Sequence, residues 1–339
     1  MKTLTISIAA YNVEKFLSKT LSELADERLS KYIEVLIIDD GSKDKTGLIA
    51  SEYQSKYPDV FKYVHKENGG HGSTINKGMA LATGKYFRVL DGDDSLDVDN
   101  LLLQLKRMNQ YDDDMFISDF RSITSSGKRY IDKYVMKNGK NIFEHLNDNE
   151  VYTINDDIPY MQFIGLSTLS IKTELLRKYP FVITEKCYYV DIEFVVYCMA
   201  LAKSFRFFSK PVYLYLQDAN GGNSISKENM KKNIKMQEMV SEKLLSIHQE
   251  LKKNDMLIGK EHIIEQRIIA TISATIRTYL LMDDTKRRIK AFEKVINIES
   301  IDIFNKMNRS FFIHVLRSGN YMLVPLIAFV YRCYVKWKY

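Results

Sequence analysis

Apolar and polar positions alternate along the first hundred residues in a way that predicts strands and helices in turn. Short apolar runs predict strands, and apolar residues spaced three and four positions apart predict helices. Strands are predicted at 3–9, 33–38, 61–65 and 86–90, and helices between them at 13–25, 45–56 and 73–82. Strands and helices that alternate at this pitch form a parallel sheet with helices on both faces. The pattern therefore predicts an α/β domain.

The pattern changes after about residue 109. Up to residue 226 it is less regular, with predicted strands at 115–119 and 205–208 and a predicted helix at 192–202. Beyond residue 226 it is mainly helical, and two apolar stripes run along 236–251 and 264–280. We therefore expect an α/β domain over 1–226, with halves 1–108 and 109–226, and a helical C-terminal region over 227–339.

Polar residues gather where the predicted strands end. Tyr11–Asn12, Asp39–Ser42 and Asp91–Asp94 each follow an apolar run. In open α/β sheets the carboxyl ends of the strands form the edge where ligands bind. These three turns are therefore the first candidates for a functional site.

The run Asp91–Gly92–Asp93–Asp94 is a candidate cation site. Carboxylates at a strand end can hold a divalent cation, and such a cation neutralises a diphosphate. Gly92 allows the backbone to turn tightly there. The same D-x-D spacing recurs at Asp97–Asp99 and Asp112–Asp114, where we expect a helix start or a solvated turn instead.

A glycine-rich turn, Asn68–Ser73, precedes a predicted helix. Backbone N–H groups in such a turn can approach phosphate or sugar oxygens. A flexible surface loop is the alternative, and for Asp39–Asp40 the alternative is an ordinary helix N-cap. Three polar turns at successive strand ends favour a shared ligand site.

Three segments together carry a resemblance to a known family. They are SIAAYNVEKFL, IEVLIIDDGSKDKT and ENGGHGSTINKGMALATGKYFRVLDGDD. In this order and spacing they resemble the nucleotide-binding half of family 2 glycosyltransferases, closely over 1–105 and more loosely over 106–226. The resemblance implies a GT-A, Rossmann-like fold over 1–226, with 1–108 as the nucleotide-binding half and 109–226 as the acceptor half. It also implies inverting transfer from a nucleoside diphosphate-sugar, with UDP as the expected nucleotide.

The resemblance also implies roles for residues of the donor pocket. Ala9 and Tyr11 would line the pocket for the base, and Asp40 would accept a hydrogen bond from a pyrimidine N–H. His71 would lie near the donor. Asp91 would reach the ribose or the water shell of the metal.

Two further residues are implied to act in catalysis. Asp93 would bind Mn²⁺ or Mg²⁺ directly. Asp191, in a segment that resembles the family's catalytic-base region, would take the proton of the acceptor hydroxyl. Val190 stands where the family often has an acidic residue, so Glu193 is a rival for the base, and a helix N-cap is the structural alternative for Asp191. The Q-x-x-R-W of processive members is missing after Gln217, which favours transfer of a single sugar.

Positive charge is concentrated at the C-terminus. Residues 286–339 contain eleven Lys or Arg and three Asp or Glu, whereas the whole chain has a net charge of +6. A nucleic-acid binder would more often spread its basic residues over a recognition surface, so we expect no nucleic-acid partner. The apolar stretch 321–331 is too short to span a bilayer. Segment 311–339 is therefore expected either to lie at an anionic membrane interface or to pack on the core.

The expected location follows from both ends of the chain. The N-terminal sequence lacks the pattern of a cleaved signal, so we expect a cytoplasmic protein, peripheral at the inner face of the cell membrane. The resemblance to family 2 glycosyltransferases implies that the acceptor is a hydroxyl of a glycan or a lipid-linked glycan in surface-polysaccharide synthesis. The three cysteines are expected to be buried thiols. A nucleotidyltransferase and a non-catalytic nucleotide-sugar-binding protein are the alternative functions.

Overall fold

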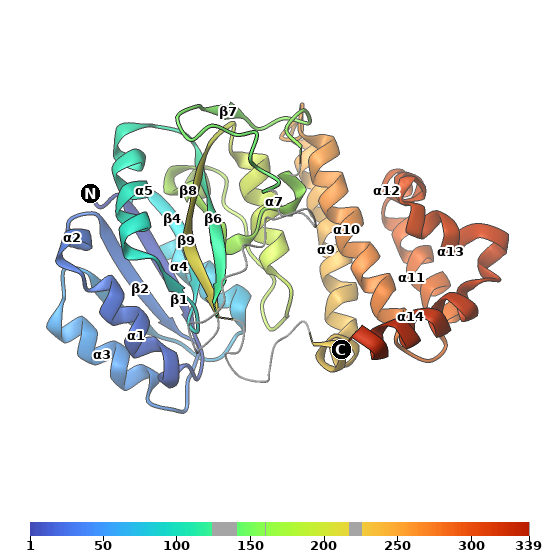
Figure 1. Cartoon of the computed structure of the whole chain (residues 1–339), viewed down its shortest axis with the longest axis horizontal. Helices are drawn as coiled ribbons and strands as arrows, with labels where there is room; N and C mark the ends of the chain where they lie inside the picture. The colour runs from blue at the N-terminus through green and yellow to red at the C-terminus, as the bar shows by residue number, and fades with distance from the viewer. Residues whose placement is uncertain (124–140, 160, 217–225, 339) are drawn as a thin grey trace. The chain divides into compact units, whose positions relative to one another are not determined.

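The computed structural model describes residues 1–123, 141–159, 161–216 and 226–338. Two compact units follow one another along the chain, Met1–Gly221 and Gly222–Tyr339. The first is an α/β unit built on one sheet, and the second consists of helices (Figure 1).

The first half of the sheet is parallel, as predicted. β1 (Leu4–Ala10) lies between β2 (Ile33–Asp39) and β4 (Tyr86–Asp91), and β3 (Phe61–His65) pairs with β2. Because β1, β2 and β4 run in the same direction, the turns that follow them lie at one edge of the sheet. The register places Ala9 beside both Ile38 and Asp91.

The second half of the sheet is mixed and extends the parallel half that the first hundred residues predict. β8 (Leu169–Lys172) is antiparallel to both β4 and β6 (Met115–Ile123). β6 is parallel to β9 (Ser204–Leu216), which extends well beyond the predicted strand 205–208. Short strands β5 (Ser95–Leu96) and β7 (Tyr152–Thr153) pair with β9 in the antiparallel sense.

Helices cover both faces of the parallel half. Leu4, Ile6 and Ile8 of β1 share one buried cluster with Leu17 and Leu21 of α1, and α5 adds apolar side chains to the same cluster. The alternate residue Ser7 faces α4, where Gly78 packs so closely that a Cβ atom would lie 2.1 Å from Ser7 Oγ. The helices of this unit are α1 (Glu14–Leu24), α2 (Glu27–Ser30), α3 (Thr46–Lys56), α4 (His71–Leu81), α5 (Val98–Gln110), α6 (Thr173–Lys178) and α7 (Asp191–Leu201).

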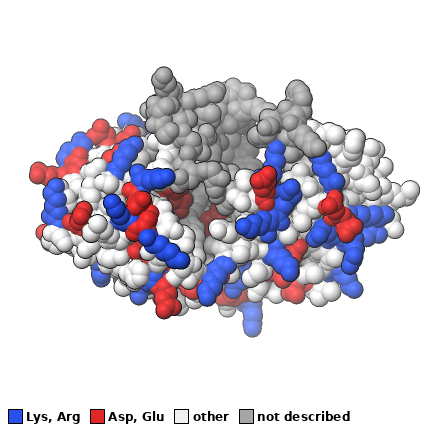
Figure 2. Space-filling model, turned by 90° about the horizontal axis from the view of Figure 1, so that it is seen from below, with Lys and Arg blue, Asp and Glu red and all other residues white. Residues whose placement is uncertain are grey.

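The second unit is helical, as predicted. Its two long helices, α9 (Ile234–Lys253) and α10 (Glu261–Leu280), pack through the predicted apolar stripes, in which Leu244 and Ile268 are fully buried. The others are α8 (Lys227–Lys232), α11 (Thr285–Glu299), α12 (Ile301–Lys306), α13 (Phe311–Tyr321) and α14 (Val324–Lys338). Figure 2 shows Lys and Arg side chains over much of the visible face of this unit, with Asp and Glu side chains between them.

The last helix has one packed side and one exposed side. α14 contacts α10, α11 and α13, and its residues Val324 and Ala328 are buried. One side of α14 therefore packs on the other helices of this unit. Within the described residues, no helix is both long enough and apolar enough to cross a membrane. Cys187 and Cys198 are buried as expected, but Cys333 on α14 is exposed.

Candidate active site

The turn after β4 is shaped by close contact with β1. Gly92 N–H donates to Ala9 O at 3.0 Å, and a Cβ atom on Gly92 would lie 2.7 Å from that same oxygen. Only glycine fits without moving the backbone. The turn therefore holds Asp91 and Asp93, both half-buried, against the end of β1.

Asp94 anchors this turn to β9 through two hydrogen bonds. It is 2% exposed, its Oδ1 accepts Leu216 N–H at 2.7 Å, and its Oδ2 bonds the Tyr213 hydroxyl. Burial and the charges of Asp91 and Asp93 raise the pKa of Asp94 to about 8. Sequence analysis did not identify Tyr213, because Tyr213 and Asp94 are 119 residues apart and no local pattern links them.

His71 brings an imidazole to the carboxylates. Its Nε2 atom lies 3.2 Å from Asp91 Oδ1. Burial alone would lower the pKa of His71, but the carboxylates of Asp91, Asp191 and Asp40 outweigh burial and raise it. In return, His71 holds the pKa of Asp91 below its ordinary value despite burial. The described structure thus gathers His71, Asp91 and Asp191 within electrostatic reach of one another.

Asp93 has no such cation beside it. Burial and the charge of Asp91 raise the pKa of Asp93, and His71 offsets this only in part. Three carboxylates, Asp91, Asp93 and Asp94, therefore crowd one turn, and two of them hold a proton more tightly than usual. A divalent cation would relieve this repulsion, so the donor set fits a hard metal ion.

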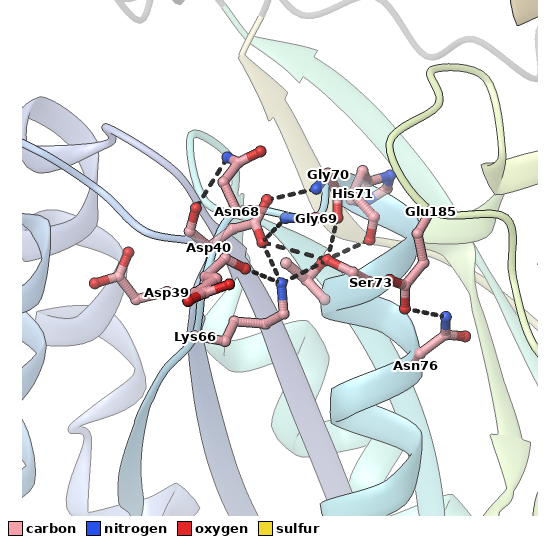
Figure 3. A network of polar contacts seen from close by, with 12 residues as sticks. Asp39, Asp40, Lys66, Asn68, Gly69, Gly70, His71, Ser73, Asn76 and Glu185 are labelled. Atoms are coloured by element: carbon pink, nitrogen blue, oxygen red, sulfur yellow. Dashed lines mark hydrogen bonds and ion pairs between the residues drawn. The ribbon is translucent and has the colours of Figure 1, made fainter.

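Asp40 lies at the centre of a polar network that fixes the glycine-rich turn (Figure 3). Its Oδ1 accepts Gly69 N–H at 2.9 Å and pairs with Lys66 Nζ at 2.5 Å, while its Oδ2 accepts Gly70 N–H at 2.8 Å. Ser73 Oγ also donates to Oδ1. Asp40 is only 2% exposed. In the sequence analysis Asp40 is expected to bind the nucleotide base. Lys66 was not identified there, because it lies 26 positions from its partner Asp40.

The loop after β1 lies beside the loop after β2. Asp40 N–H donates to Ala10 O at 2.9 Å, and Asn12 N–H donates to Ser42 Oγ at 3.0 Å. Tyr11 between them is 48% exposed, so its ring is available to a ligand. The predicted pocket residues Ala9, Tyr11 and Asp40 are therefore brought to one place.

The glycine-rich turn also packs against the segment that leads to Asp191. Lys186 N–H donates to Gly69 O at 2.5 Å, and Asn76 Nδ2 on α4 donates to Ile183 O at 2.9 Å. Gly70 has a φ of +79°, in the left-handed region that favours glycine. α4 begins at His71, two residues before the predicted start, which places this side chain at the helix N-terminus.

The two candidate bases differ in their surroundings. Asp191 is the first residue of α7 and is half-buried, whereas Glu193 is fully buried. Glu193 Oε2 accepts the backbone N–H of Thr184 at 2.9 Å. Glu193 therefore anchors the loop before Asp191, and Asp191 is the carboxylate with access to a ligand.

The other D-x-D matches have structural roles. Asp97 caps α5 by accepting Asn100 N–H at 2.9 Å. Asp112 pairs with Lys85 and Lys172, and Asp114 also pairs with Lys172. These residues lie outside the turn after β4 and carry no site.

A second group of possible metal ligands lies in the helical unit. His248, Glu261 and Glu265 could bring three ligand atoms together. However, Lys306 Nζ lies 2.6 Å from Glu265 and Lys252 Nζ lies 2.6 Å from Glu261. The chain's own ammonium groups already neutralise these carboxylates, so the group is a network of ion pairs.

Comparison with known proteins places part of the chain in a family. Residues 5–168 match the model of glycosyl transferase family 2. An uncharacterized glycosyltransferase of Mycoplasma pneumoniae, the MG060 homolog, is 30% identical over 206 residues, 60% of this chain and 64% of that protein. The minor teichoic acid biosynthesis protein GgaB of Bacillus subtilis is 34% identical over 91 residues, 26% of this chain and 10% of that protein. The chain thus spans less than two thirds of the length of these relatives.

Solved structures show the same fold. TarS residues 1–349 of S. aureus, in complex with UDP-GlcNAc, superpose with a TM-score of 0.58 and 16% identity, covering 93% of this chain and 92% of that one. This fold is the GT-A fold implied by the sequence, here followed by a helical C-terminal part. The family match assigns residues 5–168 to glycosyl transferase family 2, and the fold agrees with that assignment.

Proposed function

We propose that the protein transfers a single sugar from a UDP-sugar to a hydroxyl of a glycan or lipid-linked glycan, in the synthesis of cell-surface polysaccharide. The observation that carries this proposal is the grouping of Asp91 and Asp93 with His71 and Asp191 at the end of β4. The relative named for teichoic acid biosynthesis supports the acceptor class, and the TarS complex with UDP-GlcNAc supports the donor class.

The donor would lie across the ends of β1, β2 and β4. The exposed ring of Tyr11 offers a stacking surface for a flat base. Among the described residues, Asp40 Oδ2 accepts Gly70 N–H, and a second lone pair on this oxygen could accept a base N–H. Through Gly69 and Gly70, Asp40 also sets the position of His71, which would lie near the diphosphate and the departing group.

Asp93, with Asp91 beside it, would hold Mn²⁺ or Mg²⁺. When bound there, the cation would offset negative charge on the diphosphate as the sugar departs. Two half-buried carboxylates at a rigid turn suit such an ion, because their mutual repulsion makes a cation favourable. The raised pKa of His71 favours its protonated form, which would add positive charge on the same side.

Asp191 would act as the general base. Its carboxylate would take the proton of the acceptor hydroxyl while the hydroxyl oxygen attacks the anomeric carbon. The bond between that carbon and the phosphate oxygen breaks on the opposite side, so a single displacement inverts the anomeric configuration. Glu193 would hold the loop in place through Thr184.

A two-step experiment tests this function. A panel of nucleotide sugars with Mn²⁺ is first screened for thermal stabilisation of the purified protein, since a ligand that binds only the folded form raises its apparent stability. The stabilising donor is then incubated with the enzyme, and release of the nucleoside diphosphate is measured. Stabilisation without any release, with or without glycan acceptors, would favour a non-catalytic binding protein.

We also propose that the enzyme works at the inner face of the cell membrane as a peripheral protein. The cluster of basic residues in 286–339 supports this location, because anionic lipids attract such a segment.

A further inference from the structure

We propose that the exposed side of α14 and the basic cavity beside it form a docking site for an anionic phospholipid bilayer. This inference rests on the proposed membrane location and is independent of the proposed reaction. It names the residues that would enter the interface and those that would meet the lipid phosphates.

The exposed side of α14 is apolar, the reverse of an ordinary surface helix. Leu326, Phe329, Val330 and Tyr334 are 60%, 65%, 57% and 48% exposed. We call these four residues the α14 face. Met322 just before the helix is 75% exposed and continues the apolar surface. A contiguous apolar patch of this kind marks an interaction site, whereas single apolar residues scattered over a surface are ordinary.

A basic cavity adjoins the α14 face. Its volume is about 730 Å³, and one wall consists of Pro325, Ala328 and Phe329 from α14. The rest comes from the start of α11 and from Arg332, and comprises Asp283, Asp284, Thr285, Lys286, Arg287 and Lys290. Four basic side chains and two acidic ones give the cavity a net positive charge. It also lies at the N-terminus of α11, where the helix dipole favours an anion.

Two basic residues of the cavity are held in place from within the unit. Arg332 Nε donates to Leu280 O at 2.8 Å, and Lys290 Nζ donates to Asn320 at 3.0 Å. These contacts fix both side chains in the lining of the cavity. Lys286 and Arg287 add charge from the first turn of α11.

A bilayer matches both parts of this surface at once. Lipid phosphates complement the cavity, and the boundary between headgroups and acyl chains accepts Leu, Phe, Val and Tyr side chains from one side of a helix. α14 is too short to span the hydrocarbon core, so a helix lying in the plane of the interface is the arrangement that suits its length. A soluble acidic protein would match the charge, but it would need its own apolar patch.

Flotation with vesicles tests the proposal on the full-length protein. We expect binding to vesicles of phosphatidylglycerol and phosphatidylcholine, weak binding to phosphatidylcholine alone, and weaker binding at high salt. The double variant Leu326→Ser/Phe329→Ser should lower the partition constant at least tenfold. Lys286→Glu/Arg287→Glu should do the same on the anionic vesicles only.

Matched variants control for general effects. Ile258→Ser removes an apolar side chain that is 78% exposed elsewhere in the unit, and Lys231→Glu/Lys232→Glu reverses two exposed lysines of α8. Both should bind vesicles like the wild type. Cys333 is exposed while Cys187 and Cys198 are buried, so an environment-sensitive dye on Cys333 should report an apolar surrounding when anionic vesicles are added.

Three outcomes would overturn the proposal. The first is a wild-type protein that stays unbound to anionic vesicles at low salt. The second is wild-type binding by both test variants, with unfolding curves showing that all variants are folded. The third is a dimer in light scattering that Leu326→Ser/Phe329→Ser converts to a monomer, which would assign the α14 face to a second copy. Donor hydrolysis, measured in parallel without vesicles, judges the proposed reaction separately.

Discussion

Gly72 at the start of α4 lies directly against the carbonyl oxygen of Thr184, so closely that a Cβ atom on Gly72 would be 2.0 Å from it. This contact joins the helix that carries His71 to the loop that leads into Asp191. The donor side and the proposed base side of the site therefore share one packed boundary. A small structural change at this contact should therefore move both sides of the site.

Gly72→Ala should separate the two sides of the site. The backbone of Thr184 cannot give way as a flexible side chain would, so the added methyl should shift the loop before Asp191 and destabilise the fold by about 1–3 kcal/mol. A displacement of about 1 Å can cost on the order of 10² in rate. Turnover should therefore fall by more than the loss of folded protein alone would explain. Denaturant unfolding and turnover measure the two effects.

Gly259→Ala is the matched control for Gly72→Ala. Gly259 has a φ of +73° and nothing within 4 Å of an added Cβ atom, so alanine there costs backbone strain alone. Turnover should remain close to wild type. If Gly72→Ala also retained wild-type turnover, the boundary at Thr184 would have no part in positioning the site.

Asp93→Asn should remove the dependence on a divalent cation. The substitution keeps the shape of the side chain but removes the charge that makes the turn attractive to a cation. Thermal stabilisation by UDP with Mn²⁺, relative to UDP with EDTA, should disappear, and turnover should be lost. Asp99→Asn serves as control, because the side chain of Asp99 is 78% exposed and pairs with Arg28 at the surface. Wild-type turnover of Asp93→Asn in EDTA would contradict the assignment.

Asp191→Asn and Glu193→Gln should separate the two candidate bases. Asparagine at 191 cannot take a proton, so turnover should fall by roughly 10²–10⁴-fold while donor affinity stays similar. Glutamine at 193 still offers an oxygen to Thr184 N–H, so turnover should change by only a few-fold. The opposite ranking of the two variants would make Glu193 the base.

The parallel half of the fold could be predicted from the sequence because its information is local. Strands 33–38 and 61–65 are short segments rich in apolar residues, and both are observed at or within one residue of the predicted bounds. β8 has only four residues, LSIK, and its partners lie far away in the sequence. A strand so short is fixed by the edges of β4 and β6 beside it, which is information that periodicity does not contain.

The candidate site also divides into features that are visible locally in the sequence and contacts between residues far apart in it. Glycine and aspartate at strand ends pointed to Asp91 and Asp40, because turn chemistry is visible in a few consecutive residues. The partners that set their properties were missed, namely Lys66 and Tyr213, because each contact spans a long stretch of chain. The exposed side of α14 was likewise hidden, since an apolar helix can be buried on either side until its neighbours are known.

Asp94→Asn should make the stability of the metal-free protein less dependent on pH. In the fold, burial and the charges of Asp91 and Asp93 raise the pKa of Asp94 to about 8, far above the ordinary value of 3.8. Between about pH 4 and pH 8 the folded state therefore keeps a proton that the unfolded state releases. The free energy of unfolding should fall as pH rises through this window, by up to about 1.4 kcal/mol per pH unit from this group. Asparagine can still accept Leu216 N–H and contact Tyr213, but it has no proton to lose. Urea unfolding at pH 5, 6, 7 and 8 in EDTA should show a steeper decline for the wild type than for Asp94→Asn, and equal slopes would mean that Asp94 titrates normally.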